Sequence, residues 1–168
     1  DGRVVREHKF PTGLMDVVAF PSAGLYYRIL LDNHERPFPK QIPEEESSFK
    51  LCRIERKKMI KGGKIQLCTH DGRTFIFDGQ VDHKIGDSLK ISLPEQKVLD
   101  VIKLERGALV YVSGGKNVSR VGRVVEVRRL GMGRTSVVLR SDSEEFETIQ
   151  QYVFPIGRET PLISLPEQ

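Results

Sequence analysis

The chain has 168 residues, with 27 Lys and Arg against 23 Asp and Glu and a formal net charge of +4. This length allows one ordinary domain or two small ones and excludes a large multidomain enzyme. No window approaches the ~18 consecutive apolar residues of a membrane-spanning helix. Charged residues among the first eight also interrupt any signal-peptide core. We therefore expect an intracellular folded protein without a membrane segment.

Apolar and polar residues alternate along the whole chain, and no longer stretch shows a 3.6-residue period. The sequence therefore predicts an all-β fold, mainly β with one or two short helices. The best helix start is Pro43, because three glutamates follow it and suit the positive end of a helix dipole. The predicted strands span residues 25–31, 50–54, 64–68, 74–77, 88–93, 97–104, 108–113, 123–129, 135–140 and 145–150.

Three turn sequences connect these strands as hairpins. Asp71-Gly72 is a preferred pair where a two-residue hairpin needs positive φ. Pro94-Glu95 predicts a second hairpin and Gly131-Met132-Gly133 a third. A boundary is predicted within residues 104–107, where strand spacing restarts. Each part is then small and needs its neighbour or a partner for stability.

The positive charge is concentrated in two segments. Residues 53–64 hold 6 basic and 1 acidic side chains, residues 103–140 hold 9 and 2, and residues 141–168 hold 1 and 6. Arginine dominates the second segment, and its planar fork matches phosphate oxygens in pairs. The segments indicate a nucleic-acid partner. A solvated surface that faces the acidic end of the chain is the alternative, and charge alone leaves it open.

The sequence shows no recognisable catalytic arrangement. Its four histidines lie in separate segments, and no Gly-x-Ser-x-Gly elbow is present. Gly62-Gly63-Lys64 and Gly114-Gly115-Lys116 lack the ending of a nucleotide-binding loop, so they fit tight turns whose amides can meet phosphate. Cys52, Cys68 and His70 form a weak zinc set, and two buried strand cysteines beside a turn histidine are the favoured interpretation. We expect no enzyme activity, metal, cofactor or small-molecule substrate.

The segment from Gly107 to Val124 resembles a KOW motif, a strand-loop-strand unit of ribosomal and transcription-elongation proteins. Alternating valines would face the core, a glycine pair would allow the sharp turn, and a later glycine would allow a second backbone to approach. The match departs at Ser119, where many members carry glycine. The resemblance implies a five-stranded SH3-like barrel over roughly residues 105 to 155. The residues that carry it are Val110, Val112, Gly114, Gly115, Gly122 and Val124.

Further segments extend the resemblance over essentially the whole chain, to the archaeal and eukaryotic small-subunit ribosomal protein family S-four-e. They are Asp1-Gly-Arg-Val4, Pro11-Thr-Gly-Leu-Met-Asp-Val17, Tyr27-Arg28, Phe49-Lys-Leu-Cys52, Thr69-His-Asp-Gly-Arg-Thr74, Gly86-Asp87 and Ile163-Ser-Leu-Pro166. Family members begin with an additional small RNA-binding domain. The resemblance thus implies a fragment, in which residues 1–9 are the closing strand of that domain. A central β-domain at 10–104 and a KOW barrel with a C-terminal extension at 105–168 would follow. The short ending after Pro166 is more typical of archaeal members.

The resemblance implies a structural constituent of the small ribosomal subunit in the cytoplasmic ribosome, beside neighbouring small-subunit proteins. It would bind ribosomal RNA through basic loops, with phosphate and 2′-hydroxyl contacts more than base reading. The alternative is a non-enzymatic KOW-type protein-interaction module of transcription or ribosome assembly. The candidate RNA-binding residues are Arg56, Lys57, Lys58, Lys61, Lys64, Lys116, Arg120, Arg123, Arg128, Arg129 and Arg134.

Overall fold

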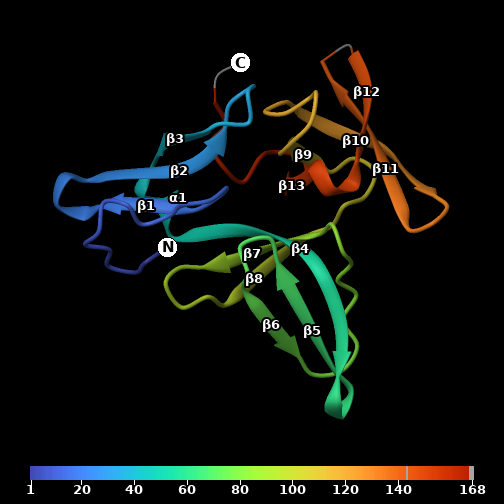
Figure 1. The fold of residues 1–168 in the computed structure, drawn as a ribbon, viewed down its shortest axis with the longest axis horizontal. Coiled ribbons are helices and arrows are strands. Elements are labelled where there is room, and N and C mark those ends of the chain that lie inside the picture. The colour runs from blue at the N-terminus through green and yellow to red at the C-terminus, as the bar shows by residue number, and fades with distance from the viewer. Residues whose placement is uncertain (143, 167–168) are drawn as a thin grey trace.

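The computed structural model describes residues 1–142 and 144–166 and contains three antiparallel sheets around a shared core (Figure 1). The predicted mainly β fold is confirmed. Among the described residues the only α-helix is the four-residue α1 (Glu44–Ser47), and the other helical segments are single 3₁₀ turns. As predicted, three glutamates occupy the first turn of α1, but Pro43 lies at the N-cap position, just before the first turn in which it was predicted. No helix in the described part is long and apolar enough to cross a membrane.

The first sheet has two outer strands that the alternation pattern did not predict. It contains β1 (Val17–Phe20), the 3₁₀ turn η1 (Pro21–Ala23), β2 (Leu25–Leu31) and β3 (Pro37–Ile42), in the order β1-β2-β3. β3 carries two prolines, which cannot donate to a strand ladder and are tolerated at a sheet edge. Since β3 pairs only with β2, both prolines are accommodated.

The middle sheet is built around one long strand. It contains β4 (Phe49–Ile60), the 3₁₀ turn η2 (Lys61–Gly63), β5 (Lys64–Thr69), β6 (Thr74–Phe77), β7 (Ser88–Ser92) and β8 (Val98–Ile102). The order is β6-β5-β4-β7-β8. The first half of β4 pairs with β7, and its second half pairs with β5. The sequence predicted only residues 50–54, because the basic run that follows shows no alternation.

The last sheet forms the five-stranded SH3-like unit that the KOW resemblance implied. It contains β9 (Leu109–Val112), β10 (Val121–Leu130), β11 (Arg134–Ser141), β12 (Glu144–Ile149), the 3₁₀ turn η3 (Gln150–Tyr152) and β13 (Val153–Gly157). The order is β12-β11-β10-β9-β13. Val110, Val112 and Val124 are buried in its core together with residues of β11 and β13. The unpredicted β13 is again an edge strand and contains a proline.

Gly115 and Gly122 of the KOW segment have the roles that the resemblance implied, whereas Gly114 makes a close packing contact. Gly115 adopts the positive φ (+75°) of a sharp turn. A Cβ on Gly114 would lie 2.7 Å from the ring of Tyr152, and one on Gly122 would lie 3.1 Å from the carbonyl oxygen of Arg140. Ser119 adopts φ +69°. This left-handed conformation favours glycine, which explains why glycine suits that position of the motif.

The three predicted hairpins are present, but the first has a different loop. The backbone N–H of Thr69 donates to the carbonyl oxygen of Arg73 (2.9 Å), so three residues lie between the paired positions. Of these three residues, Gly72 alone has positive φ, at +83°. This is a type I turn followed by a left-handed glycine, and not the two-residue turn that Asp71-Gly72 predicted.

One hydrophobic cluster joins the three sheets. It includes Met15 just before β1, Leu30 in the first sheet, Leu51 and Ile102 in the middle sheet, and Phe154 in the last. In addition, the Tyr111 hydroxyl donates to the carbonyl oxygen of Leu31 at 2.7 Å. The shared cluster crosses the predicted boundary at residues 104–107. Each small part is therefore supported by its neighbours, as its size predicts.

Residues 1–9, predicted as a closing strand, form no strand in the structure. A strand needs a partner ladder, and none of the described residues pairs with this segment. Instead, the segment is held at its first residue. The Asp1 amino group donates to the Val17 carbonyl oxygen (2.6 Å), and the Val17 N–H donates to Asp1 Oδ1 (2.9 Å). The domain limits themselves stay a prediction, and residues 167 and 168 of the last one lie outside the described residues.

Candidate nucleic-acid interface

A buried network of charged side chains surrounds Lys50. The Lys50 side chain has no exposed surface, and its Nζ lies 2.9 Å from Asp1 Oδ2 and 2.8 Å from Asp71 Oδ2. It also forms an ion pair with Asp16, and Arg73 pairs with both Asp1 and Asp71. The segment before β1, strand β4 and the β5–β6 turn thus meet at one cation. These charges are satisfied internally, so we assign them to the fold and not to a ligand.

A second buried network is centred on Arg28, whose side chain is also fully buried. Its Nε donates to Glu46 Oε1 at 3.0 Å, and its Nη2 donates to the carbonyl oxygens of Glu46 (3.0 Å) and Phe49 (3.1 Å). The other carboxylate oxygen of Glu46 accepts from the N–H and hydroxyl of Ser164. Helix α1 is thereby tied to both β2 and the C-terminal segment.

His70 lies beside the Lys50 network as a neutral, fully bonded ring. Its Nδ1 accepts from the Arg53 N–H (3.2 Å), so Nε2 carries the proton and donates to the Leu14 carbonyl oxygen (3.0 Å). Burial lowers the pKa of His70, and the nearby charges of Lys50 and Arg53 lower it further. Both nitrogens are occupied, which disfavours the zinc set considered from the sequence.

The lowered pKa of His70 predicts how stability depends on pH. Between its folded and unfolded pKa values the unfolded chain binds more protons, so the free energy of unfolding should fall as pH drops below about 6.5. For this one proton, the slope of the free energy of unfolding against pH should reach at most about 1.4 kcal/mol per pH unit. Urea unfolding at pH 7.5, 6.5 and 5.5 measures this slope. His70→Gln should flatten this dependence, and an equally steep dependence in that variant would show that another group causes it.

Asp71 extends the loss of stability to lower pH. Burial raises the pKa of Asp71, but hydrogen bonds from Lys50 and Thr69 and the charges of Lys50 and Arg73 outweigh it and hold the pKa well below its usual range. A carboxyl with a depressed folded pKa stabilises above its unfolded value and loses that contribution as pH falls. At pH 4 and below, the free energy of unfolding should therefore fall more steeply with decreasing pH in the wild type than in Asp71→Asn.

The two cysteines differ in burial, which corrects the expectation that both are buried. Cys52 is fully buried in the core of the middle sheet, whereas Cys68 is only partly buried on β5. Burial raises the pKa of the Cys52 thiol to about 12, and the charge of Asp71 adds to this. A hydrogen bond from Gln66 lowers the pKa of Cys68. The two thiols therefore have opposite tendencies to ionise.

This difference predicts selective labelling. The thiolate fraction and the solvent exposure of a cysteine control its rate of alkylation. A maleimide at pH 7.5 should therefore modify Cys68 in the folded protein, whereas Cys52 should react only after unfolding. Mass spectrometry of digested protein, with and without urea, measures both sites. Equal labelling of both cysteines in the folded protein would show that the core around Cys52 opens readily.

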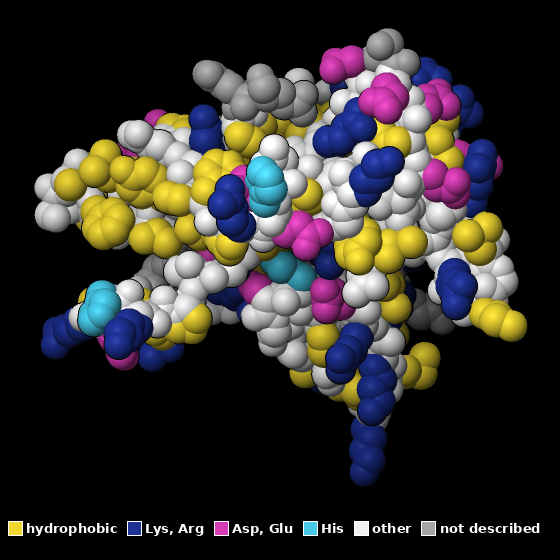
Figure 2. Space-filling model, turned by 45° about the horizontal axis from the view of Figure 1, so that its top comes forward, with side chains coloured by type: hydrophobic (Ala, Val, Ile, Leu, Met, Phe, Trp, Pro, Cys, Tyr) yellow, Lys and Arg dark blue, Asp and Glu magenta, His cyan; other side chains and the backbone are white. Residues whose placement is uncertain are grey.

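The first basic segment forms a projecting hairpin, which we call the β4–β5 arm (residues 55–66). All five of its candidate cations are exposed, and Figure 2 shows Lys and Arg surface at the end of the projection at the bottom of the view. Lys57 Nζ donates to the carbonyl oxygens of Val81 (2.9 Å) and His83 (2.8 Å), and Lys64 lies 3.2 Å from Asp78. The remaining three, which have no hydrogen bond or ion pair with any described residue, are Arg56, Lys58 and Lys61.

The second basic segment forms another projecting hairpin, the β10–β11 arm (residues 126–138). Arg129 and Arg134 are exposed on it without a side-chain partner among the described residues, whereas Arg128 donates to Glu126 at 2.8 Å. Lys116 is exposed in the loop after β9 and also has no such partner. The structure thus leaves these three cations accessible to a ligand.

Two further candidates are held by the barrel itself. Arg120 lies 4.2 Å from the centre of the Phe146 ring and 2.7 Å from Glu144. Arg123 donates to three carbonyl oxygens, those of Gly107, Arg158 and Glu159. These contacts were invisible in the sequence, because their partners lie up to 36 residues away along the chain. Neutralising either arginine would perturb the barrel as well as any ligand contact.

Strands carry more of the candidates than the expected loops do. Only Lys61, Lys116 and Arg120 lie outside strands, and the other eight lie on β4, β5, β10 and β11. A basic run on a strand pair projects cations from both faces of a twisted ribbon. The two arms therefore present charge on extended ribbons, in addition to the turns.

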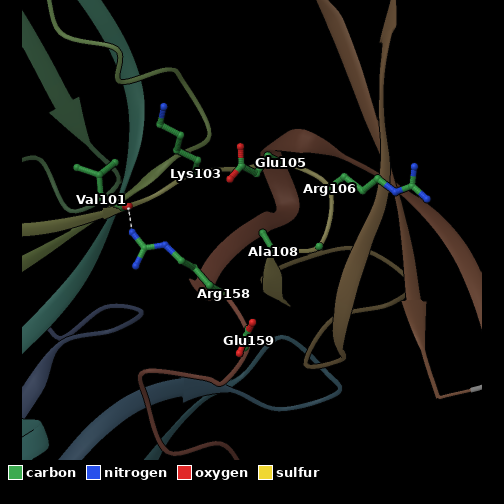
Figure 3. Close-up of a pocket in the computed structure, with 8 residues that line it drawn as sticks. Val101, Lys103, Glu105, Arg106, Ala108, Arg158 and Glu159 are labelled. Atoms are coloured by element: carbon green, nitrogen blue, oxygen red, sulfur yellow. Dashed lines mark hydrogen bonds between the residues drawn. The ribbon is translucent and has the colours of Figure 1, made fainter.

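A shallow hollow of about 490 Å³ lies between the middle sheet and the barrel (Figure 3). Its charges are mixed: Lys103 pairs with Asp82, Arg158 pairs with Asp100, and Arg158 also donates to the Val101 carbonyl oxygen (3.0 Å). The Arg106 side chain points away from the other labelled residues. No group of three potential metal ligands occurs among the described residues. This hollow offers no convergent binding chemistry.

Comparison with known proteins agrees with these features. The model of Ribosomal family S4e matches residues 23–98. The Small ribosomal subunit protein eS4 of Methanothermobacter thermautotrophicus is 40% identical, covering 99% of this chain and 69% of the relative. That of Methanocaldococcus jannaschii is 44% identical, covering 98% and 70%. The chain belongs to the ribosomal S4e family.

A solved member of the S4e family has the same fold. The crystal structure of the 30S ribosomal protein S4e from Thermoplasma acidophilum superimposes with a TM-score of 0.83 at 33% identity, covering 96% of this chain and 81% of that one. The segments that carried the family resemblance supply Asp1, Asp16, Lys50, Asp71 and Arg73 to the Lys50 network. These family segments thus contribute the structural contacts of the Lys50 network, and they lie outside both arms.

Proposed function

We propose that this chain is a structural constituent of the small ribosomal subunit that binds ribosomal RNA through the β4–β5 arm, the β10–β11 arm and Lys116 in the loop after β9. The observation that carries this proposal is the concentration, on two projecting hairpins, of exposed cations without an acidic partner among the described residues. Membership of the S4e family and the names of its relatives support the ribosomal setting. The cytoplasmic ribosome is the proposed location, and neighbouring small-subunit proteins are proposed partners.

The proposed mechanism is electrostatic and depends on shape. Cations on the arms neutralise phosphates and release condensed counterions, which supplies affinity without sequence reading. Contacts to 2′-hydroxyls add a preference for RNA. No catalytic step is part of the proposal. The residues proposed to contact RNA directly are Arg56, Lys58, Lys61, Lys116, Arg129 and Arg134. The other candidates, proposed to contribute to the positive field from their intramolecular contacts, are Lys57, Lys64, Arg120, Arg123 and Arg128.

A salt titration tests the proposal against the protein-interaction alternative. Binding of the full chain to a structured fragment of small-subunit ribosomal RNA is measured by fluorescence anisotropy between 50 and 300 mM KCl. Six phosphate contacts predict a slope of log affinity against log salt of about −5. Absence of RNA binding, or a slope near zero, would contradict the proposal. Cosedimentation of tagged protein with the small subunit in a sucrose gradient gives the ribosomal readout.

A further inference from the structure

The two arms end in chemically different tips. The β4–β5 arm ends in Lys61-Gly62-Gly63-Lys64, which is polar and basic. The β10–β11 arm ends in Leu130-Gly131-Met132-Gly133, where Leu130 is 51% exposed and Met132 is 98% exposed. Figure 2 shows hydrophobic surface at the end of the projection on the right of the view. The second tip thus presents apolar side chains to solvent.

Met132 has no packing role that explains its presence. Its backbone has φ +62°, a left-handed conformation in which glycine or asparagine is favoured over methionine. Both neighbouring positions are glycines at which a Cβ would have nothing within 4 Å, and Met132 itself is 98% exposed, so its side chain has almost no packing contacts in the described chain. A flexible apolar side chain held outward in a disfavoured conformation is a candidate for ligand contact.

The charges beside this tip indicate what the ligand is. In the strand register, Leu130 lies opposite Arg134, and Arg129 lies opposite Thr135. Two cations that have no ion-pair partner among the described residues therefore flank the apolar tip. Such cations match phosphates, whereas the apolar tip needs an apolar surface close to them. RNA offers both where a base is unstacked, because base faces inside a continuous duplex are covered by their neighbours.

We propose that the tip of the β10–β11 arm binds an unpaired nucleobase in a bulge or loop, with Met132 on the base and Arg129 and Arg134 on the adjacent phosphates. This rests on the proposed function, since it requires that the chain bind RNA. The β4–β5 arm, by contrast, contacts phosphates. The two arms therefore divide recognition: one supplies charge and the other selects irregular RNA.

The test compares two RNAs that differ only in an unpaired site: a blunt-ended duplex and the same duplex with a three-nucleotide bulge. Wild-type chain should bind the bulged RNA more tightly. Met132→Ala should weaken binding to the bulged RNA about tenfold, because alanine loses most of the contribution that a buried methionine side chain makes. It should leave the affinity for the duplex and the salt slope unchanged. Met132→Lys should strengthen duplex binding through its added charge without restoring the preference for the bulge.

A matched control is Leu99→Ala on β8, because Leu99 is also an exposed apolar side chain (57% exposed) but lies off both arms. It should change neither affinity. Unchanged bulge affinity in Met132→Ala, or a preference for the bulged RNA over the duplex in Met132→Lys as large as in wild type, would overturn the proposal. If Met132→Ala weakened cosedimentation with the small subunit but not RNA binding, the tip would dock on a protein and the proposal would again be wrong. Failure of wild type to bind either RNA would instead contradict the proposed function.

Discussion

Replacing Lys50 by alanine should lower the free energy of unfolding by about 3–5 kcal/mol, because removing one partner of a buried ion pair leaves the others uncompensated. The Lys50 ammonium forms ion pairs with Asp1, Asp16 and Asp71, and its side chain has no exposed surface. Arg73 can balance only part of the remaining negative charge. In a chain of this length the change should lower Tm by roughly 6–20 °C. Thermal and urea unfolding followed by circular dichroism measure both quantities.

Two variants separate charge from packing in this experiment. Lys50→Met keeps most of the side-chain volume but not the charge, so it should lose about as much stability as alanine does. Lys58→Ala, on the exposed half of the same strand, should change stability by less than about 0.5 kcal/mol. Wild-type stability in Lys50→Met would show that the three carboxylates do not depend on this cation.

The strands that sequence analysis missed share one physical property. β1, β3 and β13 each pair with a single neighbour, and two of them contain proline. A strand inside a sheet must donate on both sides, and this requirement produces the alternating, proline-free pattern that the sequence reading used. An edge strand escapes that requirement. β6, β8 and β12 are also edge strands and were predicted, so the three missed strands are the edge strands whose own residues do not keep that pattern.

The exposed cations were partly predictable, but their partners were not. Counting charge located both arms, because a concentration of like charges needs solvent or a ligand. It did not separate Arg129, which has no partner among the described residues, from Arg123, which bridges three carbonyl oxygens. The alternation pattern, in turn, ended the predicted strand at Ile54, because a strand that leaves the core no longer needs to alternate. Tertiary contacts decide both points.

The candidate site also contains residues that charge counting does not select. Met132 is uncharged and was noted only as part of a turn. Its exposure follows from the twist and length of the β10–β11 ribbon, which carries the tip away from the core (Figure 1). The available sequence signal was the glycine on each side, because it leaves the methionine without neighbours to pack against.

Neutralising Arg56, Lys58 and Lys61 together by glutamine should weaken binding to structured RNA roughly a hundredfold at 0.1 M salt. It should also make the slope of log affinity against log salt shallower by about 2 to 3 units, because three phosphate contacts are lost. The three side chains are exposed and have no partner among the described residues, so the fold should be unaffected. Unrelated structured RNAs should be affected similarly, since phosphate contacts carry little sequence information.

The matched control removes the same charge elsewhere, by glutamine at Lys9, Lys84 and Lys97. These lysines are exposed and lie off both arms. If binding depends on the position of the cations, the control should shift the salt slope by less than one unit. Equal shifts in the two triple variants would mean that net charge alone drives binding, and the arms would then have no special role.

A third variant, with glutamine at Lys116, Arg129 and Arg134, should match the first in slope but should also lose the preference for bulged RNA. That difference follows because Arg129 and Arg134 hold the phosphates beside the base that Met132 contacts, whereas the β4–β5 arm carries charge without an apolar tip.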